Sequence, residues 1–453
     1  MRVDSWALTD VGRARKHNED GWLIDDQLGL FAVADGMGGH AAGEIASAHA
    51  LRLVQQELLK KRPLFEQFAG ASPDQKLAMQ PQILREVELS INVASSEIFN
   101  MAQRDKKRHG MGTTLSMILI VGNKAFMAHV GDSRVYLARA TQIHQLSEDH
   151  SYLAEQVKKG NISLEEAKRS PFSNVITRAV GITETVQVDT LVFDVLPGDT
   201  YLLCSDGMHG YLETEAELSE ILSGGDGEEL PKKLISLANA RGGKDNITAV
   251  VLRMPGDASD PLTGETIAKL DILRKIPLFR HLGYKELVKV LNHTSAKQVR
   301  PGEVIIEEGS EGEEFYIILN GEVEVMKGGR PLTLLGPGVH FGEMALVDHT
   351  PRSATVRARE STRLMVLSRQ SFYQLVRTEP VLSSKLLWSF VQVLSIRLRY
   401  TNEVLSGAVG DTMGAAPFSD ERAGRPDLRV GQPGSKDAGV GEQKSTSSSD
   451  AQK

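Results

Sequence analysis

The chain has 453 residues, a formal net charge of −7 at pH 7, 41% hydrophobic residues and 25% charged residues. The length predicts two or three domains, and the acidic balance gives no electrostatic reason to expect a nucleic-acid partner. The single cysteine, Cys204, excludes an intrachain disulfide. Because no apolar signal segment and no apolar run of membrane-spanning length occurs, we expect a cytoplasmic protein without a membrane partner.

Residues 1–254 mix strand-like runs with two long helical patterns. Apolar residues recur at helical spacing over residues 43–61 and 82–104. The strand candidates follow one another with glycine and asparagine turns and few helices between them. They are LGLFAVAD, TTLSMILIVGN, KAFMAHVGDSRVYLAR, QVDTLVFDV, DTYLLCSDG and NITAVVLRM. This order predicts an α+β domain, an antiparallel β-sandwich flanked by helices.

The remaining chain divides by composition. Residues 255–265 are rich in Pro, Gly and Asp and predict a linker, and residues 406–453 predict a disordered tail. Residues 266–405 alternate short strands with glycine turns, which predicts a β-roll or jelly roll with helices. Within it, Asn320-Gly321 predicts a two-residue hairpin turn. A helical pattern over residues 371–405 closes this block.

The stretch AVADGMGGH, residues 32–40, has two chemical interpretations. The letters from Gly36 to Ala41 satisfy G-x-G-x-x-A, a dinucleotide-binding pattern. Asp35 stands directly before these glycines, however, where it would face a pyrophosphate, and the neighbouring strands are predicted to be antiparallel. We therefore interpret the stretch as a metal-binding corner, in which glycine permits a tight turn and Gly36 offers its carbonyl.

Asp35 belongs to a set of carboxylates that follow strand-like runs. Asp206 ends a second apolar run, Asp132 a third, and Asp245 stands in a glycine-rich turn before the last strand. Taken singly, each is more often a turn or capping residue. Gathered in one cleft, they would repel one another unless a cation lay between them, and ligands that are all oxygen suit Mg²⁺ or Mn²⁺. Two such ions can activate a water for displacement at phosphorus.

These segments resemble the motifs of the type-2C metal-dependent protein phosphatase family, in the family's order. The matching segments are RKHNED, ADGMGGH, HGMGTTL, HVGDSR, SDG and GGKDNIT. The resemblance covers about residues 5–254. It implies a protein serine/threonine phosphatase with two Mn²⁺ or Mg²⁺ ions and a phosphoprotein substrate, the product of a serine/threonine kinase.

The resemblance also assigns roles to individual residues. It makes Asp35 the bridge between two ions and Gly36 a carbonyl ligand, and it places Asp206 and Asp245 on the first ion. Arg15 is implied to bind the substrate phosphate, with the fork of its guanidinium suited to that anion. The implied catalytic residues are Arg15, Asp35, Asp206 and Asp245.

Three further acidic residues complete the implied metal site. The resemblance gives Glu19 and Asp20 to the second ion or its water, and Asp132 to an optional third ion. Two departures from the family pattern bear on this assignment. Met37 stands after the Asp-Gly pair, as in many bacterial members, so the proton for the leaving group would come from water. Gly210 replaces an acidic residue that often accompanies the third ion.

The resemblance implies that residues 147–181 form the family's flap, which shapes access for the substrate. The histidines of this block have no metal-ligand spacing and are predicted to be structural, as are Cys204 in an apolar strand and the scattered methionines. These histidines are His40, His129, His150 and His209.

The second informative stretch is FGEMALVDHTPRSATVRA, residues 341–358. A short helical turn offers backbone N–H groups to an anion, Arg352 can pair with a phosphate, and Glu343 can accept hydrogen bonds from a ribose. The stretch resembles the phosphate-binding cassette of cyclic-nucleotide-binding domains, and the resemblance covers about residues 265–405. The implied contacts are Gly342, Glu343, Ala345, Arg352, Ser353 and Ala354.

Together the two blocks predict a protein phosphatase that is regulated by a cyclic nucleotide. Cyclic AMP is the first expectation, although a hydroxyl at Ser353 is compatible with cyclic GMP. The alternative is a non-catalytic sensor in which the phosphatase fold serves as a scaffold. The apolar stripe of the closing helix fits packing on the barrel, and it also permits a homodimer through this C-terminal helix.

Overall fold

The computed structural model describes residues 2–38, 41–170, 172, 175–256 and 260–405. Residues 1–395 form one compact unit, so the division at residues 254 and 266 remains a prediction from sequence. The tail 406–453 and His40 lie outside the described residues, and their predicted roles remain predictions.

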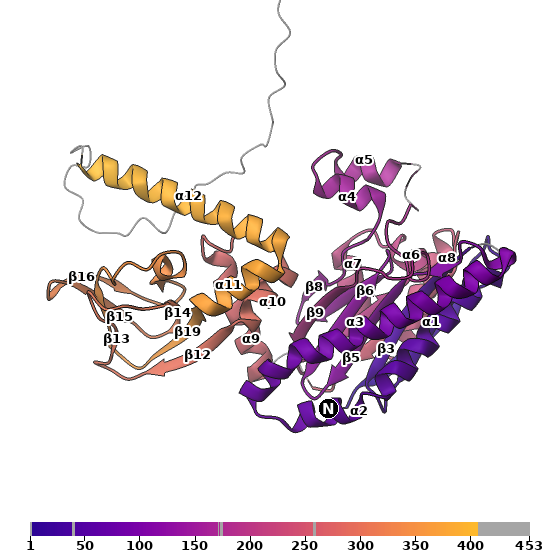
Figure 1. Cartoon of the computed structure of the whole chain (residues 1–453), viewed down its shortest axis with the longest axis horizontal. Coiled ribbons are helices and arrows are strands. Elements are labelled where there is room, and N and C mark those ends of the chain that lie inside the picture. The colour runs from indigo at the N-terminus through magenta and orange to yellow at the C-terminus, as the bar shows by residue number, and fades with distance from the viewer. Residues whose placement is uncertain (1, 39–40, 171, 173–174, 257–259, 406–453) are drawn as a thin grey trace, which may run out of the picture. The chain divides into compact units, whose positions relative to one another are not determined.

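The first 254 residues form two antiparallel sheets, with helices against their outer faces (Figure 1). The first sheet has the order β1 (Asp4–Asp10), β11 (Ile247–Arg253), β10 (Thr200–Cys204), β7 (Arg134–Arg139) and β8 (Gln142–Gln145). The second has the order β2 (Asp20–Asp25), β3 (Leu30–Met37), β5 (Leu115–Val121), β6 (Lys124–Val130) and β9 (Asp189–Asp194), with β4 (Gly112–Thr113) also paired to β3. The α+β fold class is thus confirmed.

The helices of this part fall into three groups. Against β3 and its sheet lie α1 (Ala41–Leu59), α2 (Arg62–Gly70) and α3 (Pro73–Arg104), followed by the short η1 (Lys106–Arg108). The first sheet is covered by α7 (Glu215–Ser223) and α8 (Glu229–Ala240), after the single turn α6 (Asp206–His209). Two short helices, α4 (Tyr152–Lys158) and α5 (Leu164–Arg169), belong to the predicted flap.

Burial on both faces explains the uninterrupted apolar runs of the strands. On β3, Phe31 and Val33 enter the core between the sheets, whereas Leu30 and Ala32 pack under α1 and α3. All four are at most 1% exposed. Because successive side chains of a strand point to opposite faces, a strand covered on both sides needs no polar alternation. Each large side chain buried in this way contributes roughly 1.5–3 kcal/mol.

Two sequence predictions for this part need correction. The run of residues 124–139, predicted as one strand, forms β6 and β7 in different sheets, and Gly131 between them has φ +109°. Helix α3 begins at Pro73, not at residue 82, because the hydroxyl of Ser72 accepts the Gln75 amide in a capping box. Cys204 is fully buried, as predicted.

Over residues 260–405, which the structure describes, the second part contains two four-stranded antiparallel sheets and four α-helices. One sheet has the order β12 (Thr294–Val299), β19 (Thr362–Ser368), β14 (Glu314–Asn320) and β17 (His340–Phe341); the other has the order β13 (Val304–Ile306), β18 (Thr355–Ala358), β15 (Val323–Lys327) and β16 (Arg330–Leu335). Before them come α9 (Pro261–Lys275) and α10 (Tyr284–Asn292), the turn η2 (Glu343–Leu346) follows β17, and α11 (Arg369–Thr378) and α12 (Pro380–Leu405) come last. This is the predicted β-roll with helices.

One strand pairing predicted for this part was wrong, and two element boundaries differ from the predicted ones. Strands β14 and β15 are not paired at Asn320-Gly321; they belong to different sheets, and the Gly321 turn packs against Thr362 so closely that a Cβ would lie 2.5 Å from its hydroxyl. The predicted linker 255–265 overlaps α9, which starts at Pro261 because the side chain of Asp260 caps it. The helical pattern of residues 371–405 is divided between α11 and α12 at Pro380.

The apolar stripe of α12 is only partly covered. Leu386 and Phe390 are buried, whereas Leu387, Val391 and Leu394 are 63%, 53% and 44% exposed. Packing on the barrel therefore accounts for part of the stripe, and the predicted homodimer through this helix remains a prediction.

Candidate metal centre and nucleotide site

The acidic residues predicted from sequence are brought together where the two sheets meet. Asp35 lies near the end of β3, and Asp20, the first residue of β2, stands directly opposite it in register. Asp206 begins α6 directly after β10, and Asp245 precedes β11, the neighbour of β10. We call Asp20, Asp35, Asp132, Asp206 and Asp245, together with Glu19, the carboxylate cluster.

Two glycines allow the backbones of this region to approach one another. A Cβ on Gly36 would lie 2.1 Å from the carbonyl oxygen of Gly43, and one on Gly207 would lie 2.0 Å from that of Asn246. Gly36 continues β3 with ordinary strand geometry, so it is needed for this close approach and not for the tight turn proposed from sequence. The positive φ, +139°, belongs to Gly38.

Hydroxyl groups hold one oxygen of Asp20 and leave the other without a partner. Ser205 Oγ and Thr248 Oγ1 donate to Asp20 Oδ2 at 2.7 and 2.6 Å. Thr9 Oγ1 in turn bonds Thr248 Oγ1 at 2.7 Å. Three buried carboxylate oxygens of the cluster have no hydrogen-bond partner: Glu19 Oε1, Asp20 Oδ1 and Asp206 Oδ1. Buried anionic oxygens of this kind are costly unless a cation meets them.

Burial and mutual repulsion raise the pKa values of the cluster. Removal from water is the largest cause for each of these carboxyls. It raises the pKa of Asp20 to about 7, despite the Thr248 and Ser205 hydroxyls, and that of Asp132 also to about 7, with the charge of Asp206 adding to the effect. The pKa of Asp35 lies well above its ordinary value, and that of Asp206 is raised as well. A divalent cation would reverse this, because it favours the ionised carboxylates.

Arg15 lies at the exposed side of the cluster. Its Nη2 donates to Asp245 Oδ2 at 2.7 Å, and its side chain is 49% exposed. In this arrangement Asp245 faces Arg15. Among the described residues, no group of three acidic, histidine or cysteine side chains is arranged to hold a metal ion. The oxygen-only donors and the unpartnered oxygens fit Mn²⁺ or Mg²⁺, provided that Asp245 turns from Arg15 toward Asp206.

Asp132 follows Gly131 in the crossing from β6 to β7, and histidines hold this crossing. His209 Nε2 lies 2.8 Å from the carbonyl oxygen of Asp132, and the Gly131 amide donates to His150 Nδ1 at 3.1 Å. Burial, with Arg134 nearby, lowers the pKa of His209 to about 3. This histidine is therefore neutral and serves a structural role, as the sequence predicted.

The predicted nucleotide residues lie in η2 and in the chain that follows it. Gly342 adopts φ +80° and begins the turn, and Glu343 and Ala345 follow in it. Arg352 Nη2 donates to the carbonyl oxygen of Glu314 at 2.9 Å, and Nη1 to that of Gly342 at 3.3 Å. The guanidinium therefore already lies against the start of η2.

Ser353 and Ala354 come between Arg352 and β18, close in sequence to that guanidinium. Burial is the main cause that lowers the pKa of Arg352, although the guanidinium stays charged. We call residues 341–358 the cassette.

Sequence reasoning missed several supporting residues. Ser205 and Thr248 hold Asp20, and Asn246 accepts the Glu19 amide at 2.8 Å. Under the cassette, the buried Arg369 donates to the carbonyl oxygens of Ala345 and Asp348 at 2.5 and 2.6 Å. Their proximity in sequence to Asp206, Asp245 and the helix start at Ser368 was the only available signal.

Comparisons with known proteins identify the families to which the two parts are similar. The family model Protein phosphatase 2C matches residues 9–156, and the model Cyclic nucleotide-binding domain matches residues 296–379. The serine/threonine phosphatase stp of Listeria innocua is 38% identical over 248 residues, which cover 54% of this chain and 93% of that protein. The structure of the serine/threonine phosphatase Stp1 from Staphylococcus aureus is 29% identical, covers 56% of this chain and 96% of that chain, and has a TM-score of 0.50.

A structure of the catalytic domain of the phosphatase PstP, in complex with two manganese ions, is also similar; it is 32% identical, with a TM-score of 0.47 over 55% of this chain and 97% of that one. The chain belongs to the protein phosphatase 2C family of serine/threonine phosphatases. Its phosphatase domain is followed by a cyclic nucleotide-binding domain. No helix among the described residues is long and apolar enough to cross a membrane.

Proposed function

We propose that this chain hydrolyses phosphoserine and phosphothreonine in protein substrates, at the carboxylate cluster, with Mn²⁺ or Mg²⁺. The observation that carries the proposal is the group of buried, unpartnered carboxylate oxygens of Glu19, Asp20 and Asp206 next to a partly exposed arginine. Such a group is unfavourable by itself and becomes favourable around divalent ions.

Each member of the cluster has a role in this proposal. Asp35, Asp206 and Asp245 would hold one ion, and Asp35 with the Gly36 carbonyl would hold the second. Glu19 and Asp20 would hold the water around the second ion, and Asp132 would serve a third. When bound, the ions would supply an activated water and Lewis-acid stabilisation of the phosphoryl oxygens.

Arg15 would bind the substrate phosphate. Its guanidinium can donate two parallel hydrogen bonds to phosphoryl oxygens, and its 49% exposed side chain is accessible to a substrate. Asp245 would exchange this arginine for a metal ion. His209, with its pKa lowered to about 3, is a neutral imidazole at neutral pH and not an imidazolium acid, so the leaving group would take its proton from water.

The test is Mn²⁺-dependent release of phosphate from a phosphothreonine peptide. Asp35→Asn should reduce kcat by about 100-fold or more, because it removes the proposed bridge between the ions without changing the size of the side chain. Asp226→Asn, at an exposed loop position, is the control and should retain activity. Wild-type turnover no higher than that of Asp35→Asn would support the alternative, a non-catalytic sensor built on a phosphatase scaffold.

We further propose that a cyclic nucleotide, cyclic AMP in preference to cyclic GMP, binds the cassette and regulates the phosphatase. Support comes from Glu343 as the first residue of η2, from Arg352 against the Gly342 carbonyl, and from backbone N–H groups at the start of that turn. In this proposal Arg352 pairs with the cyclic phosphate, Glu343 binds the ribose, and Gly342, Ala345, Ser353 and Ala354 complete the contacts.

Calorimetry with both nucleotides tests the cassette. Arg352→Ala should weaken cyclic AMP binding by about tenfold or more, since it removes a charge-assisted contact worth roughly 1.5–3 kcal/mol. Arg357→Ala, on the exposed side of β18, is the matched control. Unchanged affinity in Arg352→Ala would refute the phosphate contact, and tighter binding of cyclic GMP would reverse the nucleotide preference.

A further inference from the structure

Helix α10 of the C-terminal part contacts the phosphatase domain at three points. The Tyr284 hydroxyl accepts from Arg139 Nη1 at 3.0 Å, and its ring stacks on His144 with the ring centroids 3.6 Å apart. Asn292 Nδ2 donates to the carbonyl oxygen of Val192, on the edge strand β9, at 2.6 Å. The third contact is Lys285, between these two positions.

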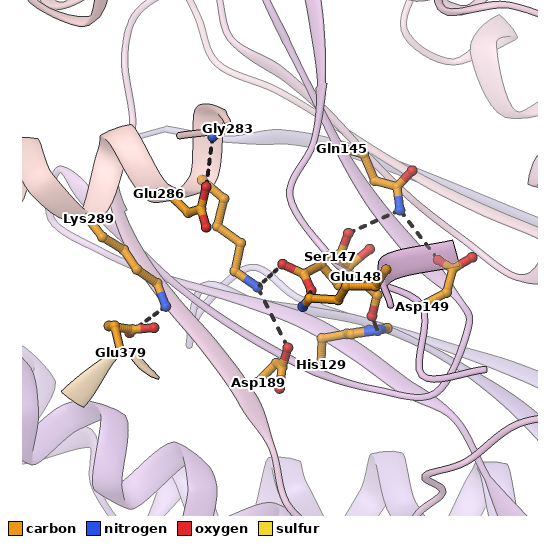
Figure 2. A network of polar contacts seen from close by, with 12 residues as sticks. His129, Gln145, Ser147, Glu148, Asp149, Asp189, Gly283, Glu286, Lys289 and Glu379 are labelled. Carbon is orange, nitrogen blue, oxygen red and sulfur yellow. Dashed lines mark hydrogen bonds and ion pairs between the residues drawn. The ribbon is translucent and has the colours of Figure 1, made fainter. Parts of the chain in front are cut away.

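Lys285 is an almost buried cation between two carboxylates. Its Nζ lies 3.7 Å from Asp189 Oδ2 and 3.9 Å from Glu148 Oε1, and its side chain is 14% exposed. Figure 2 shows Glu148 and Asp189 side by side in this network, with His129 next to them. A cation in this setting interacts more strongly than one at the surface, because less water screens it.

Asp189 connects Lys285 to both ends of the flap, residues 147–181. Arg178 Nη1, near the end of the flap, donates to Asp189 Oδ1 at 3.0 Å. His150, near its start, lies 3.4 Å from Asp189 Oδ2 and accepts the Gly131 amide. Gly131 immediately precedes Asp132 of the carboxylate cluster. The position of Asp189 therefore affects the placement of both ends of the flap and, through His150 and Gly131, of Asp132 in the proposed metal centre.

The opposite contacts of α10 lead to the cassette. Glu286 pairs with Lys385 of α12 at 2.7 Å. Lys289 pairs with Glu379 at the junction of α11 and α12 (Figure 2). At its other end, α11 carries Arg369, which holds the carbonyl oxygens of Ala345 and Asp348 in the cassette. Helix α10 thus contacts Asp189, which holds both ends of the flap, and also α11 and α12, which follow the cassette.

We propose that α10 transmits the state of the cassette to the flap, and that Lys285 is the residue through which it acts on Asp189 and Glu148. The inference rests on the proposed function, since it names the route of the proposed regulation. A ligand at the cassette that shifts α11 changes the contact of Lys289 with Glu379, and with it the position of α10. The displacement of Lys285 then changes the contacts that Asp189 makes with Arg178 and His150.

The test is hydrogen–deuterium exchange of flap amides in the full chain, with and without cyclic AMP. The readout is exchange in α4 (Tyr152–Lys158) and in residues 175–181, together with peptide hydrolysis. In the wild type and in Lys285→Arg, cyclic AMP should change flap exchange by about fivefold or more. In Lys285→Met the change should fall below about twofold, while cyclic AMP affinity and the melting temperature stay close to wild type. Lys232→Met, which removes an exposed lysine of α8, should respond like the wild type.

The outcomes separate this inference from the proposed function. If the wild type binds cyclic AMP and hydrolyses the peptide, a normal nucleotide response in Lys285→Met overturns the inference alone. Nucleotide binding that changes neither flap exchange nor turnover in the wild type also overturns it. Absence of turnover or of nucleotide binding in the wild type refutes the proposed function instead. In that case, flap exchange of Lys285→Met without nucleotide still tests whether Lys285 acts on the flap through Asp189. Faster exchange than in the wild type supports this contact, and unchanged exchange overturns it.

Discussion

Asp20→Asn should stabilise the metal-free protein at pH 8 while weakening its response to Mn²⁺. Burial, with Asp206 and Asp245 nearby, raises the pKa of Asp20 from its ordinary 3.8 to about 7. The unfolded chain therefore releases this proton at a lower pH than the folded chain does. The stability associated with protonated Asp20 is fully present below pH 3.8 and is lost as the pH rises through about 7.

The size of the effect follows from the two pKa values. A difference of about 3 between them corresponds to roughly 4 kcal/mol lost above pH 7, at about 1.4 kcal/mol per pH unit. Asparagine does not titrate, and it can accept from Ser205 and Thr248 as the carboxylate does. Asp20→Asn should therefore be more stable than the wild type by up to about 4 kcal/mol at pH 8, and by only about 2 kcal/mol at pH 5.

Urea unfolding in EDTA, followed by tryptophan fluorescence, measures this difference. Trp22 on β2 lies two residues from Asp20 and reports on the same strand. The difference should shrink with Mn²⁺, which at about 100 times its Kd adds roughly 2.7 kcal/mol to the wild type and less to Asp20→Asn. Asp226→Asn serves as the exposed control. The reasoning fails if Asp20→Asn is no more stable than the wild type in EDTA at pH 8, or if the difference is equal at pH 5 and pH 8.

Two further predictions concern buried polar groups. Arg139 and Asp199 form a bidentate pair, in which Nε donates to Oδ1 at 2.8 Å and Nη2 to Oδ2 at 2.7 Å, and the two side chains are 3% and 0% exposed. Arg139→Met should therefore lower the unfolding free energy by roughly 3–5 kcal/mol. A loss below about 1 kcal/mol in urea unfolding would contradict this. Thr248→Val removes the hydroxyl that holds Asp20 and should weaken Mn²⁺ binding by about tenfold, as measured by electron paramagnetic resonance of free Mn²⁺. Equal Mn²⁺ affinity in this variant would show that the hydroxyl does not position Asp20.

The candidate site could be named from sequence because its residues stand at chemically marked positions. Asp35 and Asp206 each end an apolar run, and a glycine follows each of them, so local sequence already indicates an exposed strand end and a close backbone approach. The cassette is equally local, since Gly342 to Ala354 lie within thirteen residues of chain. Short-range patterns of this kind can be recognised in a sequence without knowing which distant residues they contact.

Strand pairing could not be predicted with the same success. Asn320-Gly321 has the composition of a hairpin turn, yet β14 pairs with β19 and β15 with β18. Residues 124–139 likewise read as one continuous strand, although the chain changes sheets at Gly131. Which strands pair depends on contacts far apart in sequence, and a turn residue permits several such pairings without choosing among them.

The sequence by itself therefore determined the class of fold and the order of the two parts, and it named the candidate carboxylates and arginines of both sites, because these depend on residue chemistry and local periodicity. The tertiary structure alone decided what supports them. Ser205, which precedes α6, and Thr248 of β11 together hold one oxygen of Asp20. Lys285 meets Asp189 across 96 residues of chain. Neither contact can be predicted from local sequence, because the partner of a hydroxyl or ammonium group is set by the folded chain.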